Sequence, residues 1–302
     1  METLSGLDAK FLYSETPTAH MHTIKVAVSD LSDLADGYSF AVMTEVLGQL
    51  LVRLPPFRRR VVPVPLGLGH PVWVEDPGFD LARHVSRVVL DPPGDDRALA
   101  RAIGAFAGTA LPRDRPLWAL RVVEGVAGDR IAVVVKLHHA VADGSAAVAL
   151  LKNAVEAATV ASDPALPADP WTPEPLPTRT GLVTRALAEH VTRIRGLPHL
   201  IRASVSSARA SEHKRHSFEP MPPIPLHHIP KTSFNVSLDP ARTFAMTRLP
   251  LPVMRGIGRA TGTTLNDVYL TVCAGALRTY LADQGELPAR PLVASVPVAT
   301  DS

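Results

Sequence analysis

The feature that most constrains this fold is an apolar run that ends in two histidines. Residues 131–137 are rich in β-branched side chains and follow a Gly-Asp-Arg turn. Such a run is typical of a strand that is buried on both faces. It leads directly into the heptapeptide His-His-Ala-Val-Ala-Asp-Gly, residues 138–144. The sequence therefore predicts a buried strand that places two imidazoles, a carboxylate and a glycine at one edge of a sheet.

These residue types suit proton transfer. Successive side chains of a strand point to opposite faces, so we expect His138 and His139 to diverge. An unperturbed imidazole titrates near neutrality and can take a proton from a hydroxyl group. Asp143 either orients an imidazole or pairs with an arginine to fix the loop, and Gly144 fits a position with positive φ or a close neighbour. The alternative without chemistry is two ordinary histidines in a turn, with Asp143 capping a helix.

Two other kinds of site fit less well. A metal site needs converging ligands, whereas adjacent histidines on a strand diverge, and no His-x-x-x-His or Cys-x-x-Cys pattern supports one. We therefore expect no metal. A serine hydrolase would use Ser145, but the Gly-x-Ser-x-Gly turn of such enzymes is missing. Ser145 is more simply a helix cap.

The heptapeptide resembles the active-site motif of bacterial wax ester synthase/diacylglycerol acyltransferases, most closely the actinobacterial members. Residues 4–12, Glu15-Thr16-Pro17 and Met21-His22 are similar to the N-terminus of that family, and Pro116-Leu117-Trp118 to its Pro-Leu-Trp motif. Three further matches follow the family order: Phe57-Arg58-Arg59-Arg60, Phe234-Asn235 and Leu265-Asn266-Asp267-Val268. The resemblance covers essentially the whole chain.

The resemblance implies an O-acyltransferase. It would move a long-chain acyl group from acyl-CoA to the hydroxyl of diacylglycerol, and also to fatty alcohols to make wax esters. No cofactor is expected, because acyl-CoA is a co-substrate. Two alternatives stay open: an inactive lipid-binding or partner-binding module, and an acyltransferase of the same fold with a different hydroxyl acceptor.

The resemblance also implies roles for residues. His139 is expected to be the general base and His138 a supporting residue, while Asp143 holds the loop through a salt bridge and Gly144 keeps the following helix close. Asn266 is expected to donate a hydrogen bond to the substrate or the developing oxyanion, with backbone capping as the alternative. Trp118 is expected to pack beneath the site or to form a wall of the acyl tunnel.

The pattern along the chain predicts an α/β fold with a mixed sheet and helices over one face. The resemblance implies the chloramphenicol-acetyltransferase-like fold of CoA-dependent acyltransferases, with an incomplete second domain. Expected strands lie at 24–28, 85–90, 117–123, 131–137, 242–249 and 292–296, and expected helices at 40–54, at 98–106 and from Leu265, behind Thr264.

Three segments are expected. Residues 1–160 would form the acyltransferase domain with the histidine motif, and residues 161–230 a proline-rich linker with a basic amphipathic helix. The resemblance implies that residues 231–302 begin a truncated C-terminal domain. Three explanations stay open: a fragment, a frameshifted gene, or half of a protein that a separate chain completes.

Composition and charge narrow the partners and the compartment. The net charge is only +2, so nucleic acid is not an expected partner. The single cysteine excludes an intramolecular disulfide, and no signal peptide or membrane-spanning stretch is evident. These features predict a cytoplasmic protein.

A basic amphipathic helix is expected within residues 182–205. Its apolar side chains alternate with arginines: Leu187, Val191, Ile194 and Ile201 with Arg185, Arg193, Arg195 and Arg202. Such a helix can rest on an anionic surface, here the inner face of the cell membrane or a lipid droplet. The alternative is a helix packed between two domains with a solvated basic face.

Overall fold

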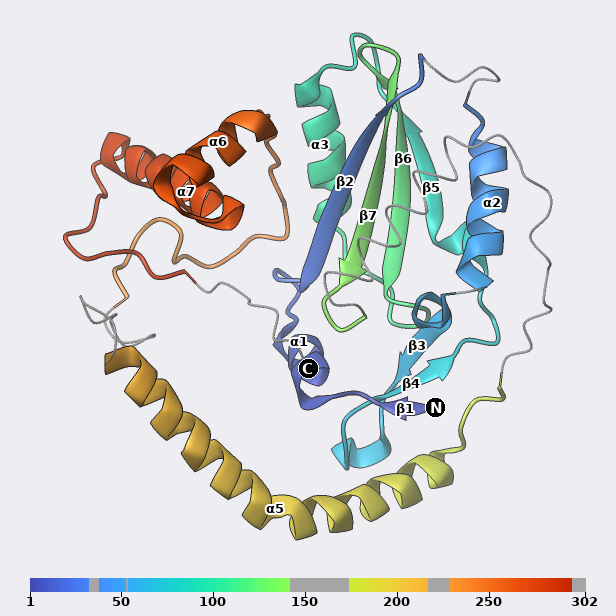
Figure 1. Ribbon diagram of the computed structural model, residues 1–302. Helices are drawn as coiled ribbons and strands as arrows, with labels where there is room; N and C mark the ends of the chain where they lie inside the picture. Colours follow the sequence, from blue (N-terminus) through green and yellow to red (C-terminus); the bar gives the residue numbers. More distant parts are fainter. Residues whose placement is uncertain (33–37, 53, 142–173, 217–228, 295–302) are drawn as a thin grey trace. The chain divides into compact units, whose positions relative to one another are not determined.

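The computed structural model describes residues 1–32, 38–52, 54–141, 174–216 and 229–294 (Figure 1). The chain divides into two compact units. The first comprises Met1–Arg195 and Leu238–Met246, and the second comprises Gly196–Ser237 and Thr247–Ser302. The predicted boundary at 160 lies outside the described residues and the one at 230 adjoins such a stretch, so both stay predictions.

A four-stranded mixed sheet forms the centre of the first unit, in the order β2-β7-β6-β5. Its strands are β2 (His22–Asp30), β5 (Val85–Val89), β6 (Trp118–Val126) and β7 (Arg130–His138). β7 pairs antiparallel with β2 along its whole length and antiparallel with β6 on its other side, while β5 runs parallel to β6. The four strands predicted for this part of the chain are confirmed, and the histidine motif follows a central one.

Among the described residues, a helix covers each face of this sheet (Figure 1). α2 (Phe40–Val52) packs against the face formed by the odd-numbered residues of β7, and α3 (Asp96–Ala107) against the face of the even-numbered ones. The side chains that the helices bury are Met43, Leu47 and Leu51 from α2, and Leu99, Ile103 and Phe106 from α3. The prediction that helices cover one face was wrong, because β7 is apolar on both faces and each needs a cover.

A smaller antiparallel sheet in the first unit has the order β1-β4-β3. Its strands are β1 (Glu2–Thr3), β3 (Arg59–Val62) and β4 (Val72–Glu75). Helix α1 (Gly6–Ser14) follows β1 and begins at Ser5, whose hydroxyl accepts from the backbone N–H of Asp8 at 3.1 Å. Three 3-10 helices, Pro55–Arg58, Pro65–Gly67 and Leu81–Arg83, connect the strands of the first unit.

The long helix α5 (Arg179–His216) begins in the first unit. Its first turns bury Leu182 and Ala186 against Val64, Val72 and Val74 of the smaller sheet and its connection. Among the described residues, no helix has both the length and the apolar composition that crossing a bilayer would require.

The second unit contains the C-terminal part of α5 and two helices in contact, α6 (Leu251–Thr261) and α7 (Leu265–Asp283). The predicted start of α7 is confirmed by a capping box. The Thr264 hydroxyl accepts from the backbone N–H of Asp267 at 3.2 Å, and the Asp267 carboxylate accepts from the backbone N–H of Thr264 at 2.9 Å. Residues 292–294 form no strand, contrary to the prediction for 292–296.

The predicted strand at 242–249 is also wrong. Residues 238–246 return to the first unit and run along the glycine side of α3. The carbonyl oxygens of Arg242 and Pro240 lie where side chains at Gly104 and Gly108 would otherwise stand. The Arg242 guanidinium donates to the carbonyl oxygen of Thr18 at 2.6 Å. An extended segment becomes a strand only beside another strand, and this one lies against a helix.

Gly104→Ala is expected to destabilise the first unit. The new Cβ would overlap the carbonyl oxygen of Arg242, and backbone on both sides leaves no flexible group to move away. We expect a loss of about 1–3 kcal/mol in the free energy of unfolding, measured by urea denaturation. Gly275→Ala in α7 is the matched control, because its Cβ would meet open space. The control should be neutral or stabilising by about 0.5–1 kcal/mol. Equal stability of the two variants would contradict the close approach.

Candidate active site

Polar side chains replace apolar ones at the carboxyl end of β7, on the face that α3 covers. Along this face Ala132 and Val134 are followed by Lys136 and His138, and all four are buried. In β2, His22 stands opposite His138 in the antiparallel register. A row that begins as hydrophobic core therefore ends in ionisable groups that have little contact with water.

Lys136 of β7 connects the end of α3 to the sheet through hydrogen bonds. Its ammonium donates to the carbonyl oxygens of Phe106 and Thr109, both at 2.7 Å, and to the Thr109 hydroxyl at 2.8 Å. The carbonyls at a helix C-terminus carry partial negative charge, which favours a cation there. Burial and the nearby Arg121 lower the pKa of Lys136 to about 8. Sequence analysis gave Lys136 no role, although a lone lysine inside a buried apolar run is itself a signal that acceptors lie nearby.

His138 is buried, with only 1% of its surface exposed. Its ring Nδ1 accepts from the backbone N–H of Ala140 at 3.0 Å. The backbone N–H of His138 donates to the carbonyl oxygen of Leu117 at 3.0 Å. Its Nε2 lies 3.7 Å from a carboxylate oxygen of Glu15. Burial, together with Arg113 and His139, lowers the pKa of His138 to about 3. The ring is thus neutral near pH 7.

His139 is exposed, unlike its neighbour, as strand alternation predicts. Its ring stacks on Phe11 of α1, with the centroids 4.7 Å apart and the planes 17° from parallel. Its backbone N–H donates to the carbonyl oxygen of Met21 at 2.9 Å. Partial burial and the nearby Lys25 lower the pKa of His139 from its ordinary value. An imidazole that is accessible, neutral and held in one plane is suited to accept a proton.

Two more imidazoles adjoin the motif. The rings of His20 and His22 have centroids 5.4 Å apart, and the His22 ring meets His138 edge-on at 6.0 Å. The pKa of His22 is lowered to about 3. Burial is the largest cause, and smaller electrostatic contributions come from Lys136, His138, His20 and Arg242. In the described part of the chain, no group of three or more His, Cys, Asp or Glu side chains is arranged to hold a metal ion.

Trp118 lies in the core between the sheet and α2. It is 1% exposed, and its indole N–H donates to the carbonyl oxygen of Phe57 at 2.7 Å. Its ring stacks on His84 with centroids 4.5 Å apart. This geometry favours packing beneath the site over a tunnel wall, and contact with substrate stays a prediction.

Three predicted residues remain: Asp143, Gly144 and Asn266. Asp143 and Gly144 lie outside the described residues, so their roles stay predictions. Asn266 is exposed in the first turn of α7, in the second unit. There it lines a cavity of about 730 Å³ with mostly apolar neighbours, including Leu249, Met254 and Tyr269.

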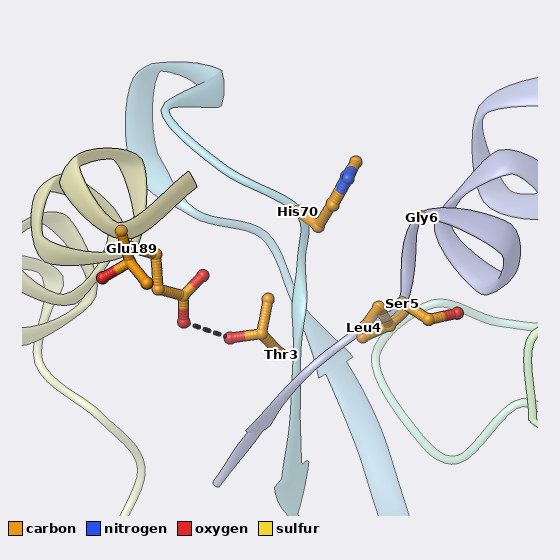
Figure 2. A pocket seen from close by; sticks show the side chains of 7 residues that line it. Thr3, Leu4, Ser5, Gly6, His70 and Glu189 are labelled. Atoms are coloured by element: carbon orange, nitrogen blue, oxygen red, sulfur yellow. Dashed lines mark hydrogen bonds between the residues drawn. The ribbon is translucent and has the colours of Figure 1, made fainter. Parts of the chain in front are cut away.

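Two cavities lie near the start of the first unit. One, of about 340 Å³, reaches the turn after His139 and is lined by Ala140 and Val141, with Trp73, Asp8 and Arg59 among the other lining residues. The other, of about 550 Å³, lies between α5 and the start of α1 (Figure 2). The Thr3 hydroxyl donates to Glu189 at 2.6 Å, and Figure 2 shows this hydrogen bond between two residues that line the second cavity. Of these two cavities, the first is lined by described residues of the motif.

Sequence reasoning gave no site role to several residues that surround the two histidines: Phe11, Glu15, His22, Lys25, Arg113 and Lys136. Phe11, Glu15 and His22 belong to the N-terminal pattern that carried the family resemblance. That pattern contained the signal, but only folding brings the end of α1 beside the end of β7.

Comparison with known proteins identifies the family. Residues 4–269 match the model of the wax ester synthase/diacylglycerol acyltransferase catalytic domain. Two Mycobacterium tuberculosis proteins, provisionally named diacylglycerol O-acyltransferases, are similar to the chain. One is 38% identical over 304 residues, covering 100% of this chain and 63% of the relative. The other is 37% identical over 302 residues, covering 99% and 63%.

A solved structure has the same fold. The wax ester synthase/diacylglycerol acyltransferase from Marinobacter aquaeolei VT8 superposes with a TM-score of 0.60 and is 28% identical, covering 98% of this chain and 65% of that one. The chain thus spans less than two thirds of the length of these relatives. The similarity confirms the predicted fold class, a mixed sheet with covering helices. On the match over residues 4–269, the chain belongs to the wax ester synthase/diacylglycerol acyltransferase catalytic domain family.

Proposed function

We propose that the chain carries the proton-transfer half of an O-acyltransferase site. The enzyme would transfer a long-chain acyl group from acyl-CoA to the hydroxyl of diacylglycerol, and also to fatty alcohols. The observation that carries this proposal is the contrast between the two motif histidines. His138 is buried and hydrogen-bonded to the turn, whereas His139 is exposed and held flat against Phe11. The names of the relatives point to the same chemistry.

His139 would act as the general base. A nitrogen of its neutral imidazole takes the proton of the acceptor hydroxyl as that oxygen attacks the thioester carbonyl. The carbon–oxygen bond forms, the carbon–sulfur bond breaks, and the proton passes to the sulfur of the departing CoA. This direct transfer needs no nucleophilic serine or cysteine and no cofactor.

Other residues would support the transfer. Asp143 holds the motif loop through a salt bridge, Gly144 keeps the next helix close, and Trp118 supports the strand ends from beneath. Asn266 would donate a hydrogen bond to the substrate or to the developing oxyanion. The cavity beside Asn266 is mostly apolar, which suits contact with hydrocarbon chains.

His139→Ala is expected to lower acyl transfer about 10²- to 10⁴-fold, the range that a general base contributes. The measurement is release of CoA and of ester from labelled acyl-CoA and diacylglycerol. His190→Ala, at an exposed histidine of α5, is the control and should retain full activity. Full activity in the His139 variant would exclude this histidine as the base. Substrate binding without any ester from the unaltered protein would instead favour a binding module.

Lys25→Gln is expected to shift the acid limb of the pH–rate profile to higher pH. Lys25 lowers the pKa of His139, so removing its charge raises that pKa. A base is lost as the pH falls through its pKa, so the variant should lose activity at a higher pH than the unaltered protein. The profile of kcat/KM against pH measures this, and a limb that moves to lower pH would contradict it.

We infer further that α5 contacts an anionic lipid surface. Leu182 and Ala186 of this helix are buried against the smaller sheet. At 3.6 residues per turn, Leu187, Val191 and Ile194 lie on the opposite side of the helix, and all three are exposed. The helix carries many more basic than acidic side chains, Arg195 and Arg202 among them, which suits anionic headgroups.

Ile194→Asp is expected to weaken binding to phosphatidylglycerol vesicles at least about tenfold, because a carboxylate on the apolar side must leave water and repel the lipid. Cosedimentation measures the bound fraction. Ala188→Asp adds the same charge at an exposed position off the apolar side and is the matched control. Binding should also weaken at high salt. Equal binding of the two variants would contradict this role of α5.

A further inference from the structure

The end of α1 contacts both histidines of the motif. Phe11 stacks on His139, and Glu15, the residue that ends the helix, faces His138 with its carboxylate 3.7 Å from Nε2. Glu15 also forms an ion pair with Arg113, from the loop between α3 and β6. Three segments far apart in the sequence therefore meet at the buried ring of His138.

The hydrogen bond at Nδ1 fixes the tautomer of His138. Because Nδ1 accepts from the backbone N–H of Ala140, it carries no proton, and the proton of the neutral ring must sit on Nε2. That Nε2 is buried and has no hydrogen-bond partner among the described residues, so the Glu15 carboxylate is the anionic group it faces. A nearby negative oxygen favours the proton at Nε2 over the proton at Nδ1.

The charge of Glu15 is balanced by Arg113. A lone carboxylate beside an imidazole would favour the protonated ring, which carries N–H groups at both nitrogens. A proton on Nδ1 would break the bond from Ala140 and release the turn that follows His139. With Arg113 in place, its positive charge balances the negative charge of the Glu15 carboxylate. The ring then faces an acceptor oxygen that belongs to an ion pair with no net charge. Glu15 can then select the tautomer without charging the ring.

We propose that Glu15, neutralised by Arg113, is a positioning residue that holds His138 as its Nε2–H tautomer and thereby fixes the turn that carries His139. The link to acyl transfer rests on the function proposed above. The tautomer and the turn geometry do not depend on it.

Other charged and titratable groups face His138 and bear on its protonation. They are His22 of β2, His20 before it, Arg113 and Glu15, and, on its own segment, Lys136 and His139. Apart from Glu15, each of these is a cation or an imidazole. Among the described residues, Glu15 is thus the group that would favour a charged ring, which is why its pairing with Arg113 matters.

The direct test is ¹⁵N NMR of the histidine rings in the purified protein, with His138 assigned by substitution. We expect His138 to be the Nε2–H tautomer without titration between about pH 5 and pH 8. Glu15→Leu should give a mixture of tautomers, and Glu15→Gln, which keeps an oxygen facing Nε2, should restore the single one. An Nδ1–H tautomer in the unaltered protein, or no change in Glu15→Leu, would overturn the inference.

The charge balance is tested by pH. In Arg113→Gln the unpaired Glu15 should raise the pKa of His138, so the ring would gain a proton as the pH falls within this range. The double variant Arg113→Gln, Glu15→Gln should stay neutral again. Arg115→Gln is the control, because Arg115 pairs with Asp114 instead of Glu15. Titration of His138 that is the same in the single and the double variant would overturn the role of the ion pair.

Kinetics tests the consequence for transfer. Glu15→Leu should lower kcat about 10- to 100-fold with little change in the KM for acyl-CoA, because a displaced base slows chemistry more than binding. Glu15→Gln should retain most of the activity, and an unchanged kcat in Glu15→Leu would overturn the positioning role. If the unaltered protein transfers no acyl group, the proposed function fails, and the NMR result still decides the tautomer.

Discussion

Strand β7 is buried on both faces and paired on both edges, and the rest of the first unit depends on this constraint. Its odd-numbered side chains need α2 and its even-numbered ones need α3. Any polar group on such a strand has to find its partners inside the protein, because water does not reach it. Lys136 and His138, at its carboxyl end, are the buried polar residues that need such partners.

These two residues find their polar contacts in different parts of the chain. Lys136 takes the carbonyl oxygens at the end of α3, and His138 takes the backbone N–H of its own turn while facing Glu15. The polar end of β7 thereby fixes the position of a helix and of a loop at once. These contacts also fix the position of the exposed His139, because its backbone belongs to the same turn and its ring stacks on Phe11.

Under the function proposed above, the same organisation would give two adjacent histidines a supporting role and a catalytic role. A base must be accessible to substrate, whereas the group that fixes its backbone is best protected from competing water. Strand alternation meets both needs, because it buries one histidine and exposes the next. The chain belongs to an acyltransferase family, which is why we propose a catalytic role for the exposed histidine. In that proposal Glu15 and Arg113, which lie outside the heptapeptide, would help to hold the buried histidine.

The sequence by itself determined the local elements. The apolar run at 131–137 predicted a strand, Thr264 predicted the start of a helix, and strand alternation predicted the divergence of the two histidines. Each of these depends on neighbours a few residues apart. The strand predicted at 242–249 was wrong, because part of this segment lies against α3 and not beside another strand. Only the tertiary structure decided that α3 and α2 cover opposite faces, and that Glu15, Arg113 and Lys25 surround the motif. Glu15 and Lys25 are more than a hundred positions from the histidines they approach, and the geometry of these contacts follows from packing.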